Sequence, residues 1–169
     1  MSKKLWIVIA VFLGLLALTP LALPIFLSVG AKSDSTVISE RTLEIFRIDS
    51  SFSRESYTLE IIDRDSIFIY SYTNPENQNR NMVFRFDPVE SQLHYGPSKI
   101  DLLNKGVYIN DLSFDLYDEP GDIIHGIGPL LFNKTYGVLG WDNGAGDQYF
   151  FTDSTYTQLV PIELYGLNN

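Results

Sequence analysis

Two hydrophobic patterns follow each other along the chain. Residues 5–31 form a continuous apolar run without a charged side chain. As a helix, this run would reach roughly 40 Å, more than the hydrocarbon core of a bilayer at about 30 Å. After the polar joint at residues 32–35, apolar and polar positions alternate with a period of two. The sequence therefore predicts one N-terminal hydrophobic transmembrane or signal helix within residues 1–32 and a β-rich domain over residues 33–169.

The N-terminal segment has two interpretations. A retained signal anchor uses the whole apolar run, whereas a signal peptide uses a shorter part of it and is cleaved after Ala31. Lys3 and Lys4 precede the run, so the positive-inside rule places the N-terminus in the cytoplasm in both cases. We favour the anchor and expect a single-pass protein of the cytoplasmic membrane with its C-terminal domain outside, periplasmic or at the cell surface. Cleavage would instead give a secreted or periplasmic domain.

The alternation predicts individual strands in the domain. In residues 111–118, Leu112, Phe114 and Leu116 point one way while acidic and serine positions mark the other face. We expect the apolar face of this strand to lie on the core. Residues 66–73 carry apolar side chains on both faces, which is typical of a central strand that is covered on both sides.

Turn signals separate these strands at short intervals. Residues 82–87 alternate as a further strand, and a polar loop is expected at residues 74–81. Residues 104–106, Asn-Lys-Gly, indicate a tight turn, and residues 98–103 are the one candidate for a short helix, with Ser98 as its cap. The fold class predicted is all-β: an antiparallel sandwich or partly open barrel of about nine or ten strands.

The charge is divided unevenly between the two parts. Residues 1–32 hold three of the 12 basic residues and no acid, so residues 33–169 hold nine basic residues and all 21 acids, and 9 − 21 = −12. Such an acidic domain lacks the basic footprint that nucleic acid requires, which excludes that partner class. A basic protein partner remains open. The chain has no cysteine, which excludes disulfides and thiolate metal sites.

Acidic residues and one tryptophan mark a candidate docking patch for a macromolecular partner. Carboxylates gather on one predicted strand and in the turn after it, where charge complementarity would speed the association of a basic partner. Trp141, next to a predicted hairpin, is the best single aromatic contact residue. The candidate patch consists of Asp111, Asp115, Asp118, Glu119, Asp122 and Trp141.

The hairpin loop after Trp141 offers a candidate calcium site. Asp142, Asn143 and Asp147 place three oxygen-bearing side chains on one short loop, and calcium prefers oxygen ligands. The spacing lacks the alternating acidic positions and final glutamate of an EF-hand. The plainer interpretation is a hairpin turn at Asn143-Gly144, and we expect no other cofactor.

The motifs of common enzyme classes are absent from the sequence. It contains no Gly-x-Ser-x-Gly elbow, no His-Glu-x-x-His helix and no P-loop. We therefore interpret the domain as a non-catalytic, membrane-tethered extracytoplasmic binding module for a macromolecular partner. It would be an accessory subunit of an envelope assembly or a protein that neutralises a basic partner. Two alternatives stay open: a carboxylate-based envelope hydrolase acting on glycans, and a β-domain that binds calcium or a small ligand.

Overall fold

The computed structural model describes residues 35–109, 111–120, 127–154 and 164. These residues belong to the unit Asp34–Asn169. In the part of the chain that the structure describes, no helix is long and apolar enough to cross a membrane. The predicted N-terminal membrane helix lies outside the described residues.

The described residues of the domain form ten strands and one short 3-10 helix. Most consecutive strands whose connections are described are joined by short turns, as expected for a chain of alternating pattern punctuated by Gly, Asn and Pro. The elements are β1 (Ser35–Phe46), β2 (Phe52–Arg64), β3 (Ile67–Thr73), η1 (Gln78–Arg80), β4 (Met82–Asp87), β5 (Gln92–Tyr95), β6 (Ser98–Ile109), β7 (Leu112–Asp118), β8 (Leu130–Asn133), β9 (Gly137–Asp142) and β10 (Gln148–Thr152).

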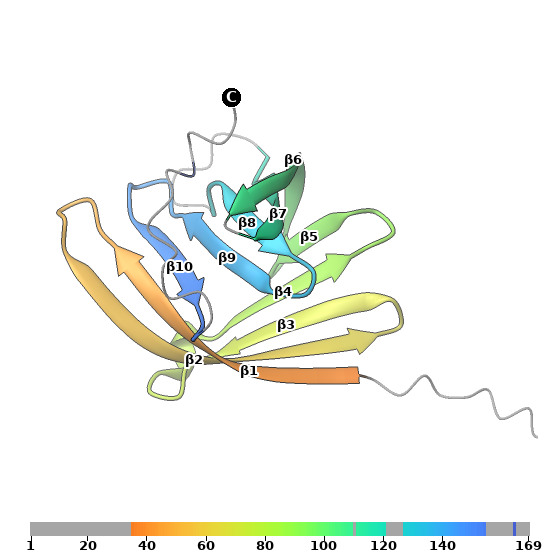
Figure 1. Ribbon diagram of the computed structural model, residues 1–169, viewed down its shortest axis with the longest axis horizontal. Coiled ribbons are helices and arrows are strands. Elements are labelled where there is room, and N and C mark those ends of the chain that lie inside the picture. Colours follow the sequence, from red (N-terminus) through yellow and green to blue (C-terminus); the bar gives the residue numbers. More distant parts are fainter. Residues whose placement is uncertain (1–34, 110, 121–126, 155–163, 165–169) are drawn as a thin grey trace, which may run out of the picture. The chain divides into compact units, whose positions relative to one another are not determined.

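The strands form a closed antiparallel barrel in chain order. Each strand pairs with the next, and β1 also pairs with β10 over Thr42–Phe46 and Gln148–Thr152, which closes the ring. Figure 1 shows β1 and β2 side by side as long, curved strands. The prediction of an all-β, antiparallel domain with about ten strands is confirmed. The ring is complete rather than partly open, because β1 is long enough to pair with β2 along its whole length and with β10 over Thr42–Phe46.

The interior of the barrel is filled with aromatic and aliphatic side chains. On β3, the predicted two-sided strand, Tyr70 and Tyr72 belong to this inner cluster, whereas Ile67 and Ile69 on the other row are half-buried. The ring of Tyr72 stacks on Phe151 with centroids 4.2 Å apart. Such packing makes the middle of the barrel a core and not a channel.

A second apolar cluster lies on the other face of β7 to β10. Phe114 and Leu116 of β7 belong to it, together with Leu164, while their neighbour Tyr117 belongs to the inner cluster. The expectation that the apolar face of this strand lies on a core is therefore confirmed for Phe114 and Leu116, although that core is the second cluster and not the interior of the barrel. Strand β7 is apolar on both faces near its end, so alternation alone does not identify which face points into the barrel.

Two local predictions about β6 are wrong. Residues 98–103 are not a helix but the first half of β6, which pairs with β5 and β7. Six residues make a marginal helix, so strand pairing on both sides prevails over local preference. Residues 104–106 are not a turn between strands but a bulge within β6, where the register with β7 shifts and Gly106 has a φ of 74°.

Candidate ligand-binding site

One end of the barrel contains a cavity of about 360 Å³. In an antiparallel meander, the connections that follow β1, β3, β5, β7 and β9 all lie at the same end, and the cavity is at that end. We call it the mouth cavity. Its lining residues are Leu43, Ile45, Arg47, Glu55, Tyr57, Asn79, Arg80, Asn81, Met82, Tyr95, Trp141 and Tyr149.

The mouth cavity forms because the inward rows of β1 and β2 change from apolar to polar at this end. On β1 the inward positions are Leu43 and Ile45, and the next position in the row, just past the end of the strand, is Arg47. On β2 the row runs from the buried Tyr57 to Glu55, which accepts hydrogen bonds. Apolar side chains that face each other fill the interior of the barrel. Charged side chains at the end of the row stay in contact with water, because burying them without partners is costly.

Aromatic side chains form one wall of the mouth cavity. The rings of Trp141 and Tyr149 are nearly parallel, with centroids 4.8 Å apart and an interplanar angle of 4°. Trp141 is 8% exposed and belongs to the inner cluster, so it anchors the β9–β10 hairpin and also faces the cavity. Burial raises the pKa of Tyr57 on the neighbouring wall. These side chains offer flat apolar surface with polar tips.

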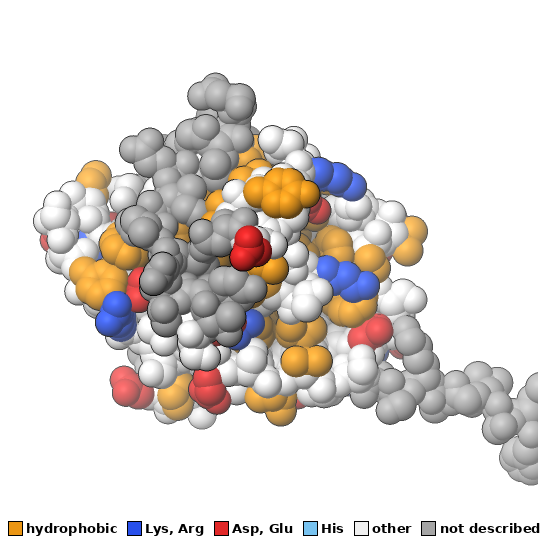
Figure 2. All heavy atoms as spheres, in the orientation of Figure 1, with side chains coloured by type: hydrophobic (Ala, Val, Ile, Leu, Met, Phe, Trp, Pro, Cys, Tyr) orange, Lys and Arg blue, Asp and Glu red, His pale blue; other side chains and the backbone are white. Residues whose placement is uncertain are grey.

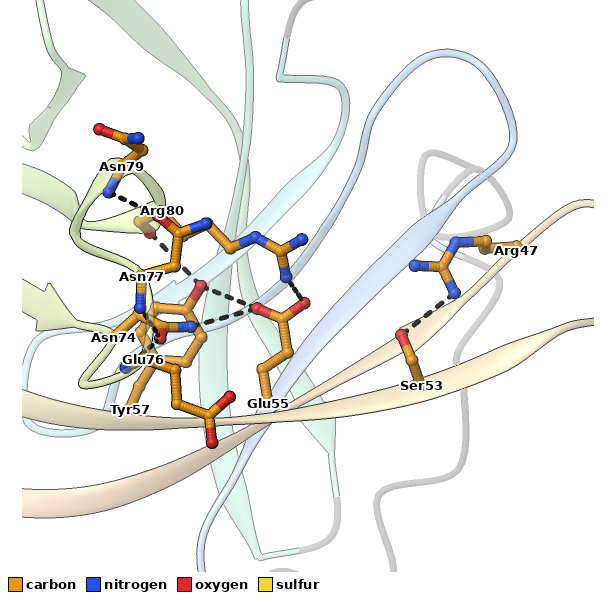
Figure 3. A network of polar contacts seen from close by, with 9 residues as sticks. All are labelled: Arg47, Ser53, Glu55, Tyr57, Asn74, Glu76, Asn77, Asn79 and Arg80. Carbon is orange, nitrogen blue, oxygen red and sulfur yellow. Dashed lines mark hydrogen bonds and ion pairs between the residues drawn. The ribbon is translucent and has the colours of Figure 1, made fainter.

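A polar network forms the opposite rim, with Glu55 at its centre (Figure 3). One carboxylate oxygen of Glu55 pairs with the Arg80 guanidinium, and that hydrogen bond raises the pKa of Arg80. The other oxygen accepts hydrogen bonds from Asn74 Nδ2 at 3.2 Å and the Tyr57 hydroxyl at 3.4 Å. Both oxygens of the carboxylate therefore have donors within the network.

The loop before β4 is held in place by its own asparagines. Asn74 Oδ1 accepts from the backbone N–H groups of Glu76 and Asn77, both at 2.9 Å. Asn81 Oδ1 accepts from the Asn74 N–H at 2.8 Å, and Asn77 caps η1. This predicted polar loop is thus a built rim that carries Arg80 over the cavity.

Arg47 lies apart from this network. Its Nη1 donates to Ser53 Oγ at 3.1 Å, and in Figure 3 no contact joins the pair to Glu55. Among the described residues, no carboxylate lies within 4.0 Å of the Arg47 guanidinium. Asp49, on the turn after it, has its pKa lowered chiefly by hydrogen bonds from Ser51 and also by the charge of Arg47. Arg47 is therefore a cation at the cavity whose donors are only partly used.

The structure does not gather the predicted acidic patch on one face. Asp115 pairs with Phe132 of the inner cluster and so lies on the inward face of β7, where it accepts from the Gly106 N–H at 3.1 Å. Asp118, three residues on, lies on the opposite face, and burial raises its pKa.

The other acidic candidates lie at the two ends of β7. Asp111 is exposed before the strand, and Glu119 follows it, where it accepts from the Ile127 N–H at 3.3 Å. Asp122 lies outside the described residues. On the face shown in Figure 2, acidic and basic side chains are interspersed and not gathered by sign. Docking of a basic partner to these residues stays a prediction.

The three candidate calcium ligands hold the β9–β10 turn. Asp142 is buried and its Oδ1 accepts from the Gly144 N–H at 2.7 Å, and Asn143 Oδ1 accepts from the Asp147 N–H at 3.1 Å. Asp147 Oδ1 accepts from the Ile48 N–H on the neighbouring hairpin at 3.1 Å. In the described ranges, no group of three or more His, Cys, Asp or Glu side chains is placed to hold a metal ion. Calcium binding by this loop stays a prediction.

A second hollow of about 670 Å³ lies against β1, β2 and β10. Three carboxylates line it, which is the arrangement closest to the expected glycan hydrolase. Glu44 pairs with Arg54 at 3.0 Å and Asp153 with Arg41 at 3.4 Å, while Glu40 is the third. Two of the three acids thus serve ion pairs, and hydrolysis at this hollow stays a prediction.

The fold and the mouth cavity define a class, an antiparallel up-and-down barrel with a site at one end. No protein-family model matches the chain, and no curated protein matches it. Among solved structures, it is similar to a DUF1329 family protein from Desulfovibrio piger, with 9% sequence identity. The match covers 73% of this chain and 86% of that chain, and its TM-score of 0.21 is too low to support any conclusion about fold or function.

Proposed function

We propose that the domain is a non-catalytic binding module whose mouth cavity takes a small molecule with a flat ring system. The observation that carries the proposal is the cavity itself, with an aromatic wall at Trp141 and Tyr149 facing a polar rim at Arg47, Glu55 and Arg80. Small-molecule sites are typically concave, apolar over most of their lining and provided with a few convergent polar groups, at volumes of about 300–1,000 Å³. Flat rings pack well against aromatic side chains.

The filled interior limits the size of the ligand. Tyr72, Phe84 and Phe151 are fully buried below the mouth and pack against one another. A long chain-like ligand would have to displace them, at the cost of a well-packed core. The proposed occupant is therefore compact, about the size of one bicyclic ring with a short substituent.

Binding accounts for the mouth cavity better than catalysis does. Among the described lining residues, Glu55 is the one carboxylate, and it is paired with Arg80. Carboxylate-based glycoside hydrolysis uses two acids across the scissile bond. We therefore propose, as the sequence predicts, a binding module tethered to the membrane by residues 5–31, but with a small molecule as its ligand instead of a macromolecule.

Calorimetric titration of the full chain with indole-3-acetamide, a neutral bicyclic probe, tests the proposal. We expect saturable binding, with a titration into protein-free micelles as the blank. Tyr149→Ala removes one ring of the aromatic wall and should weaken binding at least fivefold. Tyr108→Ala is the matched control, because Tyr108 is 78% exposed and does not line the cavity.

The far-UV circular dichroism and urea midpoint of each variant show whether it is folded. Two results would overturn the proposal: no heat of binding from any bicyclic probe, or an equal loss of affinity in the folded Tyr149 and Tyr108 variants.

A further inference from the structure

We infer that the mouth cavity selects a flat-ring carboxylate and that Arg47 is the residue that recognises the carboxylate. The inference rests on the proposed function and adds the charge of the ligand to it. The first observation is the net charge of the cavity lining, which has two cationic side chains, Arg47 and Arg80, and one anionic side chain, Glu55: 2 − 1 = +1. The surrounding residues 33–169 carry nine basic side chains and 21 acidic ones. The cavity is thus a local exception in an acidic domain.

The two arginines of the lining differ in what occupies them. The Arg80 guanidinium is paired with the Glu55 carboxylate, which in turn accepts from Tyr57 and Asn74. Because both oxygens of Glu55 are used, this carboxylate is held at the rim and does not neutralise Arg47. The Arg80 charge is therefore compensated within the protein.

Arg47 is the less compensated charge. Within the described chain its guanidinium donates to the neutral Ser53 hydroxyl, no carboxylate lies within 4.0 Å of it, and Asp49 feels its charge only from a greater distance. A guanidinium has five N–H donors in a planar fork that matches a carboxylate in two parallel hydrogen bonds. Ser53 fixes one nitrogen of the fork, which limits the side-chain entropy that a bound carboxylate would remove.

The position of Arg47 sets the shape of the ligand. It belongs to the same inward row as Ile45, whose side chain lines the cavity beside the aromatic wall. A ligand ring lying on Tyr149 and Trp141 would point its substituent out of the mouth, toward the rim. A short acidic side arm on a bicyclic ring places the carboxylate at the arginine, whereas a cationic arm in that place would be repelled.

A charge series on one ring system tests the inference. Indole-3-acetate, indole-3-acetamide and tryptamine share the indole ring and carry a negative, a neutral and a positive arm. We expect the acetate to bind the full chain at least tenfold more tightly than the acetamide, and tryptamine to bind most weakly. Arg47→Gln should lower the affinity for the acetate to that for the acetamide and change the latter less than twofold. Arg47→Lys should restore part of the preference, because it keeps the charge without the fork.

Arg85→Gln is the matched control. Arg85 is exposed, donates to the Gly96 carbonyl at 2.8 Å and lies outside the mouth cavity. Its loss should leave all three affinities unchanged. If the acetamide binds and the acetate binds no better, or if Arg47→Gln weakens all three probes equally, the inference is wrong and the proposed function stands. If no probe binds, both fail.

Discussion

Two arginines differ in their surroundings: Arg41 on the inward row of β1, and Arg47, which continues that row just past the end of the strand. Arg41 and Arg47 lie six positions apart, roughly 20 Å along a strand. Arg41 is 8% exposed; its Nη2 donates to the Tyr136 carbonyl at 3.2 Å, its guanidinium lies 4.6 Å from the centre of the Tyr136 ring, and its Nη1 pairs with Asp153. Among the described residues, the Arg47 guanidinium donates to the hydroxyl of Ser53, and no carboxylate lies within 4.0 Å of it.

The difference shows when a charged side chain stabilises the fold and when it stays available to a ligand. A buried guanidinium is tolerated when carbonyls, a carboxylate and a ring replace most of its water, as at Arg41, where only the buried Nε lacks a hydrogen-bond partner among the described residues. We call this end of the barrel, with Arg41, Tyr72 and Tyr136, the far end. At the mouth, Arg47 has no carboxylate within 4.0 Å among the described residues and keeps unused donors, which leaves it available to the proposed ligand.

The largest effect should come from removing the structural arginine. Arg41→Met leaves Asp153 and the Tyr136 carbonyl without this donor, and breaking a buried pair costs about 3–5 kcal/mol of unfolding free energy. Arg47→Met should cost at most about 1 kcal/mol, because the half-buried Arg47 side chain loses one hydrogen bond to a neutral hydroxyl. Urea denaturation at pH 7 measures both. Equal losses in the two variants would contradict the contrast between the two ends.

Glycines at the two ends sharpen the same contrast. At the far end Gly137 has a φ of 91°, and an added Cβ would collide with the buried Tyr72 hydroxyl. Gly137→Ala should therefore cost about 2–3 kcal/mol from strain and overpacking together. Near the mouth, Gly146 has a φ of 95° and its Cβ would meet the end of the exposed Ile48 side chain, which can move.

Gly146→Ala should cost about 1 kcal/mol, because only the backbone strain remains. Thermal unfolding followed by circular dichroism compares the two glycine variants. A Gly146 variant that is less stable than the Gly137 variant would show that the mouth, and not the far end, is the rigid part.

Alkaline pH should act through the far-end tyrosines. Burial raises the pKa of Tyr72 and of Tyr70 above their ordinary value of 10.0. The unfolded chain then loses these protons first, so their contribution is fully present below pH 10 and declines as the pH rises above it, by about 1 kcal/mol per pH unit for Tyr72.

Tyr72→Phe gives the test of this decline. The variant loses the hydroxyl that accepts from the Val138 N–H at 2.8 Å, so it should be less stable at pH 7, yet its stability should fall less steeply above pH 10. Urea denaturation of both proteins between pH 8 and pH 11, in steps of about one pH unit, measures how steeply the stability of each falls with pH. Parallel slopes in the two proteins would exclude Tyr72 as the group responsible.

The smallest effect is expected at Asp118, the last residue of β7. Burial raises the pKa of Asp118 above its ordinary value of 3.8, so its ionised form is slightly disfavoured in the folded state at pH 7. The penalty is absent below the unfolded pKa, grows as the pH rises between the unfolded and the folded pKa, and is complete above the folded one. Asp118→Asn should raise Tm slightly at pH 7 and not near pH 3, with the exposed Asp111→Asn as control. A lower Tm at pH 7 would reverse the sign of this prediction.

Alternation predicted the strands well where one face is wet. Met82–Asp87 is a strand as expected, with Phe84 and Phe86 buried between exposed Val83 and Arg85. On β7 it gave the strand and its buried Phe114 and Leu116 but not which face points into the barrel, because both faces are covered there. Around Gly106 it failed, because a bulge interrupts the period of two.

The mouth cavity was not predicted as a site, although the small-ligand alternative was. Its residues come from β1, β2, β4, β5, β9, β10 and the loop before β4, and only barrel closure brings them together. One signal was present in the sequence: the row Arg41, Leu43, Ile45, Arg47 has an arginine at each end of an apolar pair. A charged residue at the end of an inward-facing apolar row indicates an end of the barrel. Which of the two ends is open depends on the residues that pair with each arginine, and the sequence does not give those.

The seam between β1 and β10 determines when the barrel can be completed in the cell. The hydroxyl of Thr152 donates to the Thr42 carbonyl across a sequence separation of 110 residues. During synthesis, β1 can pair with β2 early, but its other edge has no partner until β10 has left the ribosome. Contacts of such long range form slowly, and an unpaired edge is a template for other chains. The nascent protein is therefore most exposed to aggregation just before its last strand arrives.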